Sequence, residues 1–397
     1  MDGDRQCATE HHPPSTSHRP AGPGVARRAG AHGTADAPRL PHAPLQSPML
    51  PATMRAARLH AYGQPLRIDE IAVPRPAAGQ VLVRVEGAGF CHSDLHLLSG
   101  DIQTLPKIPV TLGHENAGRV AAVGAGVTRV KEGDAVAVYG GWGDGTCDYC
   151  VAGEENCCPT FQWVGLSQHD GGYADYLLVP QERYLVPLHR LAPREAAPLT
   201  DAALTPYRAI KRALPAMTSD YPALVIGTGG LGQFGIKLLR LLTGGEVIAV
   251  DVADDKLATA REVGAHHVLN SRTLGPEATM AEIQRLSPGG VAAAFDFVGA
   301  EGTLALALGS ARKLGRVVQV GLAGGTAKLT ALQSWQPEVN FSVSFWGNIK
   351  ELREVMAMAD DGRLTPIPLE FHPLEAINDV AHRLEHGQVR GRAVVTP

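Results

Sequence analysis

Cys91 and His114 are the residues of this sequence best suited to metal chemistry. Cys91 lies in the run GFCHSD, residues 89–94, and His114 lies in GHENAG, residues 113–118. A thiolate and an imidazole with carboxylates beside them are the donors that a catalytic zinc ion needs, provided that the fold brings them together. A glycine-rich run follows more than a hundred residues downstream. A metal combined with a dinucleotide indicates hydride transfer to or from an alcohol.

The glycine-rich run, GTGGLG at residues 227–232, matches the G-x-G-x-x-G pattern of a dinucleotide-binding turn. It follows an apolar strand and opens a helix, so its free N–H groups and positive dipole end can face phosphates. Gly227 permits the tight turn, Gly229 lets the backbone approach a pyrophosphate, and Gly232 lets helix and strand pack closely. The predicted cofactor-binding residues of this turn are Gly227, Gly229, Gly230, Leu231 and Gly232.

Asp251 ends the next predicted strand, 19 residues past Gly232. A carboxylate there can accept hydrogen bonds from the adenosine ribose and would repel a 2′-phosphate. The turn therefore favours NAD over NADP. The alternative is a tight turn in an unspecialised α/β domain, with Asp251 as a helix cap.

A second candidate metal site lies in a glycine-rich segment of D-x2-C-x2-C-x7-C spacing, residues 144–158, here called the cysteine loop. Three thiolates and a carboxylate can fill all four positions of a tetrahedral zinc, which makes such a site structural. The predicted ligands are Asp144, Cys147, Cys150 and Cys158. Two alternatives remain open: Cys157 could replace Cys158, or a disulfide could form in an oxidising compartment.

Composition excludes several function classes. The net charge is −4, so no basic field points to nucleic acid or an anionic membrane as a partner. No run of 18 or more apolar residues predicts a transmembrane helix. Four of the six cysteines lie within twelve residues in a chain without a secretion signal, which favours a metal site over a disulfide framework. We expect a cytoplasmic protein with a small-molecule substrate and no membrane partner.

Residues 1–53 differ in composition from the rest. They hold nine prolines, five histidines and five arginines, but one Val and no aromatic residue. Such a segment cannot bury enough apolar surface to offset its ordering entropy, so we expect a disordered extension. A transit peptide is an alternative, although its acidic residues argue against one. The natural start could also be Met54.

The order of elements predicts an α/β protein. From Met54 to about residue 187, short apolar runs separated by Gly and Pro turns indicate a small barrel-like β domain that carries Cys91 and His114. A helix is expected at 194–214. Strands and helices then alternate, which is typical of a doubly wound parallel sheet. The expected division is 54–202 and 348–397 for a catalytic domain and 203–347 for the NAD-binding domain.

These motifs resemble the zinc-dependent alcohol dehydrogenases of the medium-chain dehydrogenase/reductase superfamily. The resemblance runs from Met54 to Pro397 and covers both candidate metal motifs, the glycine turn and Asp251. It implies a GroES-like β-barrel catalytic domain, a Rossmann cofactor domain, one catalytic zinc, one structural zinc and NAD.

The resemblance also implies roles for single residues. Cys91 and His114 would bind the catalytic zinc, and Asp201 would replace the cysteine that usually provides the third ligand. The alternative for Asp201 is a helix N-cap. Glu115 resembles an acid behind the metal, and Asp94 would orient His114. Asp144 likewise replaces the usual first cysteine of the structural site.

Further roles concern the proton and the cofactor. Ser93 would hydrogen-bond the substrate oxygen, and His96 would pass the proton to solvent. Lys256 and Arg392 match positions that contact the cofactor ribose and pyrophosphate, although either could be a surface cation.

The expected reaction is the reversible oxidation of primary or secondary alcohols to aldehydes or ketones. Aromatic residues that could line an apolar substrate pocket are Phe90, Trp142, Trp163, Phe345 and Trp346. The alternatives are a polyol or sugar-alcohol dehydrogenase on the same scaffold and a non-catalytic NAD and zinc redox sensor. The family is commonly dimeric or tetrameric, and strand 341–345 is where subunit sheets often join, so a homo-oligomer is expected.

Overall fold

The structure is a computed structural model that describes residues 50–103, 105–218, 220–329 and 337–397. Most of the predicted N-terminal extension, residues 1–49, lies outside the described residues. The first strand begins at Thr53, one residue before the expected start of the catalytic part. None of the helices in the described part of the chain is long and apolar enough to cross a membrane.

Short strands build the part that carries Cys91 and His114. Within the described residues, one sheet has the order β10-β6-β5-β3-β18-β17 with β9 also paired to β3, and a smaller sheet has the order β2-β1-β4. The strands are β1 Thr53–Leu59, β2 Arg67–Ala72, β3 Val81–Gly89, β4 Val110–Thr111, β5 Glu115–Val123, β6 Ala135–Val138, β7 Gly141–Trp142, β8 Gln162–Trp163, β9 Tyr176–Val179, β10 Leu185–Pro187, β17 Leu369–Pro373 and β18 Arg392–Thr396.

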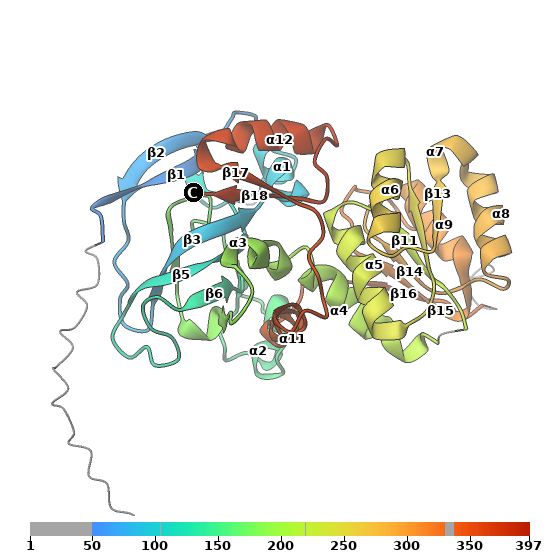
Figure 1. The fold of residues 1–397 in the computed structure, drawn as a ribbon, viewed down its shortest axis with the longest axis horizontal. Helices are drawn as coiled ribbons and strands as arrows, with labels where there is room; N and C mark the ends of the chain where they lie inside the picture. Colours follow the sequence, from blue (N-terminus) through green and yellow to red (C-terminus); the bar gives the residue numbers. More distant parts are fainter. Residues whose placement is uncertain (1–49, 104, 219, 330–336) are drawn as a thin grey trace, which may run out of the picture. The chain divides into compact units, whose positions relative to one another are not determined.

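Helices of this part are short. They are α1 His92–Ser99, α2 Asp148–Val151, α3 Pro193–Ala196, α4 Leu204–Ala213, α11 Ile349–Asp360 and α12 Ile377–Glu385, with 3-10 turns η1 Glu155–Cys157, η2 Glu182–Tyr184, η3 Ala197–Thr200, η4 Leu214–Ala216 and η5 Leu374–Ala376. In Figure 1, α12 and α1 lie beside β17 and β18. Strand β18 pairs with β3 although more than 300 residues separate them, so the C-terminal residues complete the first sheet.

The predicted doubly wound sheet is present. Its order in the described residues is β13-β12-β11-β14-β15-β16, and all its pairings are parallel. Its strands are β11 Ala223–Ile226, β12 Val247–Asp251, β13 His267–Asn270, β14 Val291–Asp296, β15 Ala311–Gln319 and β16 Asn340–Val343, and its helices are α5 Gly230–Thr243, α6 Asp254–Glu262, α7 Ser271–Leu274, α8 Pro276–Leu286 and α9 Glu301–Ser310.

Helices cover both faces of this sheet (Figure 1). Val225 packs in one apolar cluster, while its neighbours Leu224 and Ile226 pack in another with Ile283 of α8. Because successive side chains of a strand point to opposite faces, the two clusters lie on the two faces of the sheet. The glycine turn lies at the carboxyl end of the central strand β11, where open α/β sheets bind ligands.

The prediction of one continuous helix at 194–214 was wrong. The chain forms α3, η3 and α4 instead, with a break at 201–203. Asp201 leaves the helical region there, at φ −138° and ψ −60°. The apolar pattern continues through the break, so the pattern alone did not predict it. The break turns the Asp201 side chain toward Cys91.

Candidate active site

Four residues from three parts of the chain meet in one buried cluster: Cys91, His114, Glu115 and Asp201. Each offers one ligand atom, and these atoms all lie within 4.8 Å of one another. Cys91 and Asp201 are 110 residues apart in sequence. The fold therefore brings together the three predicted catalytic zinc ligands and the predicted acid behind them.

The ends of secondary-structure elements position these side chains. Cys91 precedes α1, and its N–H donates to Asp94 Oδ2 at 2.9 Å. His114 lies in the turn between β4 and β5. Asp201 lies in the break before α4, where Thr205 Oγ1 donates to its Oδ1 at 2.6 Å. That bond leaves Asp201 Oδ2 facing the cluster.

The chemistry around His114 fits a cation. Both of its ring nitrogens are buried without a hydrogen-bond partner among the described residues. Asp201 Oδ2 lies 3.5 Å from His114 Nε2 and 3.7 Å from Cys91 Sγ. Burial disfavours the imidazolium, but Asp94 and Asp201 outweigh it and raise the pKa of His114 well above its usual value. A Cys, His and Asp donor set around such a point suits zinc.

Asp94 lies behind His114, as expected, but does not bond it. Asp94 Oδ1 is 3.5 Å from His114 Nδ1, and both atoms are without a hydrogen-bond partner in the described part of the chain. The other oxygen accepts from the Cys91 N–H and from Tyr173 Oη at 2.8 Å. Asp94 is thus fixed by two donors, with its free oxygen directed at the ring.

Glu115 forms a buried pair with Arg392 of β18. Arg392 Nε donates to Glu115 Oε2 at 3.0 Å, and Arg392 Nη2 contacts Oε1. Burial raises the pKa of Glu115 to about 8, against the opposing charge of Arg392. A Cβ added to Gly230 would lie 3.2 Å from Arg392 Nη1, so the same guanidinium also reaches the glycine turn. Arg392 is therefore no surface cation.

The glycine turn has the predicted geometry. Gly227 has a φ of +85°, which favours glycine. A Cβ on Gly232 would lie 1.9 Å from the Gly227 carbonyl oxygen, whereas a Cβ on Gly229 would meet no described atom within 4 Å. The third glycine is needed for packing, and the second leaves open space beside the backbone.

Asp251 is held at the end of β12 by four donors. Its Oδ2 accepts from Thr228 N at 2.7 Å and from Thr228 Oγ1 at 3.0 Å. Its Oδ1 accepts from Val252 N at 2.7 Å and Ala253 N at 3.2 Å. The carboxylate therefore shapes the glycine turn.

His92 lies near the two cations Arg392 and Lys256. Crowding by protein atoms, followed by the charges of Arg392 and Lys256, lowers the pKa of His92 to about 4, although part of its side chain stays exposed. We did not predict a role for His92. Its position directly after Cys91, at the start of a helix, was the available signal.

The predicted proton-relay residues lie on α1. Ser93 Oγ is 3.7 Å from Cys91 Sγ, which places the hydroxyl beside the buried cluster. His96 is about one helical turn away and 35% exposed, with Nδ1 3.5 Å from Asp101 Oδ2. Residues three apart on a helix are neighbours on its surface. Ser93 thus lies beside the cluster, and His96 lies one helical turn away, where its side chain reaches solvent.

The cysteine loop gathers the four predicted ligands. One ligand atom from each of Asp144, Cys147, Cys150 and Cys158 lies within 4.8 Å of the others. Cys158 Sγ is 3.8 Å from Cys147 Sγ and 3.4 Å from Asp144 Oδ2. N–H groups of Cys147 and Thr146 lower the pKa of Asp144, which keeps it ionised. Cys157 is exposed and outside this group.

Aromatic side chains stand beside His114. Trp163 and Trp346 present edges to its ring at centroid distances of 5.8 and 6.3 Å. We call Phe161, Trp163, Phe345 and Trp346 the aromatic wall, because their rings contact one another at 4.8–6.2 Å. Phe90 instead stacks on Tyr173, and Trp142 lies tilted against Tyr184. Both are buried in the core, so their predicted place in the substrate pocket was wrong.

Trp346 is held in a left-handed backbone conformation, with φ +46°. Such a conformation costs about 1–3 kcal/mol in a bulky residue and persists only where the surroundings fix it. The Asn156 amide donates to Phe345 O at 2.8 Å, Tyr139 Oη donates to Gly347 O at 2.7 Å, and Trp346 Nε1 donates to Thr200 O at 2.9 Å. These three bonds connect the segment to three separate parts of the chain.

Comparison with known proteins identifies the family. Residues 77–190 match the family described as Alcohol dehydrogenase GroES-like domain, and residues 230–361 match Zinc-binding dehydrogenase. A NAD-dependent alcohol dehydrogenase from Sulfurisphaera tokodaii is 38% identical over 353 residues, which cover 87% of this chain and 100% of the relative. The chain belongs to the zinc-dependent alcohol dehydrogenase family.

Other members of the family show its range. The crystal structure of the alcohol dehydrogenase from Aeropyrum pernix is 38% identical with a TM-score of 0.80, covering 86% of this chain and 100% of that chain. A D-arabinose 1-dehydrogenase (NADP(+)) from Saccharolobus solfataricus is 34% identical, covering 86% of this chain and 97% of the relative. The predicted family and fold class are confirmed.

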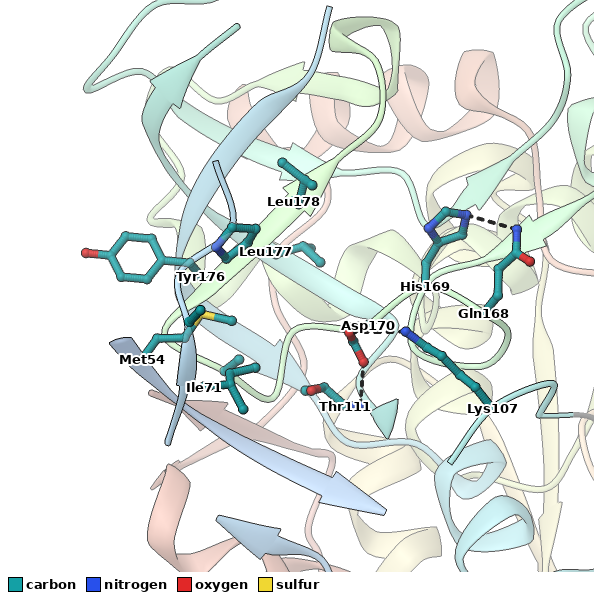
Figure 2. A pocket seen from close by; sticks show the side chains of 14 residues that line it. Met54, Ile71, Lys107, Thr111, Gln168, His169, Asp170, Tyr176, Leu177 and Leu178 are labelled. Atoms are coloured by element: carbon teal, nitrogen blue, oxygen red, sulfur yellow. Dashed lines mark hydrogen bonds and ion pairs between the residues drawn. The ribbon is translucent and has the colours of Figure 1, made fainter. Parts of the chain in front are cut away.

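A separate hollow of about 240 Å³ lies on the catalytic part. Figure 2 shows an apolar side with Met54, Ile71 and Tyr176, and a polar side where Lys107 pairs with Asp170 at 3.3 Å. No predicted site residue lies among its lining residues in the described part of the chain. The hollow therefore lies outside the family's site.

Proposed function

We propose that this chain catalyses the NAD-linked oxidation of alcohols at the buried cluster. The observation that carries the proposal is the meeting of Cys91, His114 and Asp201 in one buried cluster, with the buried guanidinium of Arg392 3.8 Å from Asp201 Oδ2. A zinc ion held by these three residues would act as a Lewis acid that lowers the pKa of the substrate hydroxyl. A second zinc would be structural, held by Asp144, Cys147, Cys150 and Cys158.

The chain's own residues move the proton. Ser93 stands beside the cluster and accepts the hydroxyl proton, and His96 passes it to solvent. Asp94 orients His114 from behind, and Glu115 balances Arg392 beneath the cluster. The products are an aldehyde or ketone and a reduced cofactor.

NAD, when bound, accepts the hydride. We place its pyrophosphate at the residue 227–232 turn beside Arg392, because the free N–H groups of α5 and this cation favour phosphate, and Lys256 would lie nearer the adenosine ribose. The adenosine ribose would lie at Asp251. We keep the proposed division of the chain into a catalytic part, 54–202 and 348–397, and a cofactor part, 203–347.

The substrate we propose is an alcohol with an apolar or aromatic group. The aromatic wall offers four rings beside the cluster, and the side chain of Phe345 is 42% exposed. Polyols need several hydrogen-bond partners, which aromatic rings do not supply apart from the indole N–H. Because one relative is a D-arabinose 1-dehydrogenase, a polyol or sugar is the second candidate substrate.

Cofactor reduction with an alcohol panel tests this function. We expect NAD reduction with 1-phenylethanol, and kcat/KM values about tenfold lower for ethanol and sorbitol, because apolar contact area discriminates by roughly that factor. Zinc analysis should give two ions per chain. One ion at the cysteine loop alone would support the redox sensor or a zinc-free reductase chemistry, and none would reject the dehydrogenase.

Asp251 should discriminate between the cofactors. We expect Asp251→Gly to weaken NAD binding about ten- to a hundredfold, the value of hydrogen bonds to a charged group, and NADP binding much less. Isothermal titration with each cofactor measures this difference. Asp251→Asn keeps one acceptor oxygen for Thr228 N and Oγ1 and loses the acceptor for Val252 N and Ala253 N, so it controls for distortion on the Thr228 side of the turn. An equal loss for both cofactors would show that Asp251 serves only the turn.

We also propose a homo-oligomer joined at β16. This strand is at the edge of its sheet in the described residues, and its Val343 is 60% exposed. Light scattering should give more than one chain per particle, and Val343→Lys should lower that number. Val151→Lys, at an exposed position in α2, should leave it unchanged. A wild-type monomer at micromolar concentration would contradict the proposal.

We propose a cytoplasmic location, because the cysteine loop groups its thiols as a metal site would, and a reducing compartment keeps such thiols available for a metal.

A further inference from the structure

The cysteine loop touches a distant segment of the chain. Asn156 lies in η1, between the predicted ligands Cys150 and Cys158, and is buried. Its Nδ2 donates to the carbonyl oxygen of Phe345 at 2.8 Å, across 189 residues of sequence. The loop therefore holds the backbone directly before Trp346.

A second connection reaches the other end of the same segment. Arg208 Nη2 of α4 donates to Glu154 Oε2 in the loop at 2.5 Å, and Nη1 donates to Glu351 Oε2 at 3.0 Å. That Glu351 oxygen also accepts from Asn348 N at 2.9 Å. Residues 345–348 are thus tied to the cysteine loop at both ends.

Both halves of the aromatic wall depend on this loop. Phe161 and Trp163 follow it directly in sequence, and Phe161 N donates to Cys158 O at 3.0 Å. Phe345 and Trp346 are attached to it through Asn156. Trp346 then packs on Trp163 at 4.8 Å and faces His114. The positions of the four aromatic-wall side chains therefore depend on the conformation of the cysteine loop.

We propose that Asn156 is a positioning residue for substrate recognition. A metal bound by the cysteine loop would hold the loop in one conformation. Asn156 would transmit that restraint to Trp346. The loop would thereby determine the shape of the apolar side of the substrate site. The identity of the substrate rests on the proposed function, but the mechanical link between loop and wall does not.

Two substitutions of Asn156 separate this role from metal binding. Asn156→Leu removes the donor at similar volume, and Asn156→Asp replaces it with an acceptor that repels the Phe345 carbonyl. Val151→Ser, at a 76% exposed position of the same loop, is the matched control. The measurements are zinc content, acrylamide quenching of tryptophan fluorescence, and kcat/KM for 1-phenylethanol and ethanol.

We expect two zinc ions per chain in every variant. In both Asn156 variants the 1-phenylethanol to ethanol ratio of kcat/KM should fall about tenfold, chiefly through KM, and quenching should increase. A Trp346→Phe background should abolish the extra quenching. Val151→Ser should change neither quantity, and chelation of the loop metal from wild type should reproduce the increase in quenching.

Several results would overturn the proposal. Unchanged ratio and quenching in folded Asn156 variants would show that the hydrogen bond positions nothing. Loss of zinc would assign Asn156 to the metal site itself, and failure of both variants to fold would make it a folding residue. Wild type that oxidises no alcohol would reject the proposed function, while the quenching measurements would still decide the link.

Discussion

Asp201→Ala should lower the zinc content from two ions to one per chain and reduce alcohol oxidation by about a thousandfold. Asp201 Oδ2 lies within 3.7 Å of both Cys91 Sγ and His114 Nε2, so its loss leaves two donors from the proposed set. A Lewis acid is worth several kcal/mol in such reactions, and each 1.36 kcal/mol is a factor of ten in rate. Metal analysis and steady-state kinetics measure the two effects.

Two companion variants show which Asp201 oxygen matters. Thr205→Val removes the donor to Oδ1 without touching Oδ2, so both zinc ions and most of the activity should remain. Asp201→Cys supplies the donor that the family usually has here and should retain zinc. If Asp201→Ala kept two ions and full activity, the residue would serve only to hold Thr205 in the first turn of α4.

Arg208→Met should destabilise the protein by about 3–5 kcal/mol, the usual cost of leaving a buried charge without its partner. Arg208 is one of the largest fully buried side chains in the described residues. Its partner Glu351 is 6% exposed and would lose its cation, whereas Glu154 is 40% exposed and can turn to water. Urea unfolding at fixed zinc concentration gives the change in the free energy of unfolding.

Neighbouring substitutions distinguish the two pairs. Glu154→Gln should cost less than about 1 kcal/mol, as exposed ion pairs do. Arg208→Met combined with Glu351→Gln should recover part of the loss, because no buried charge is then left unpaired. Equal effects of Glu154→Gln and Arg208→Met would mean that burial of Glu351 is not the cause.

Local spacing explains what the sequence could predict. The glycine turn, Asp251 and the cysteine loop each occupy a short stretch, and their chemistry requires fixed intervals within it. The structure gathers these residues as expected. Cys91 and His114 were also identified from their immediate neighbours, and the resemblance to a family added Asp201.

Long-range contacts explain what the sequence could not predict. Nothing near Arg392 indicates that it pairs with Glu115, 277 residues away. The break at Asp201 lies inside an uninterrupted apolar pattern, so the pattern does not indicate it. Packing of the surrounding residues stabilises the chain where the helical turn is missing. Phe90 and Trp163 have similar side chains, yet one is core and the other faces the cluster, since their surroundings decide.

The return of β18 to β3 also sets an order of assembly during protein synthesis. Arg392 follows His114 by 278 residues, an interval of roughly 15–55 s at ordinary rates of translation. Throughout that interval Glu115 lacks its partner Arg392, and β3 lacks the pairing with β18. Ribosome-bound chains arrested before residue 392 should therefore fail to form the finished pocket, even with every proposed zinc ligand already emerged.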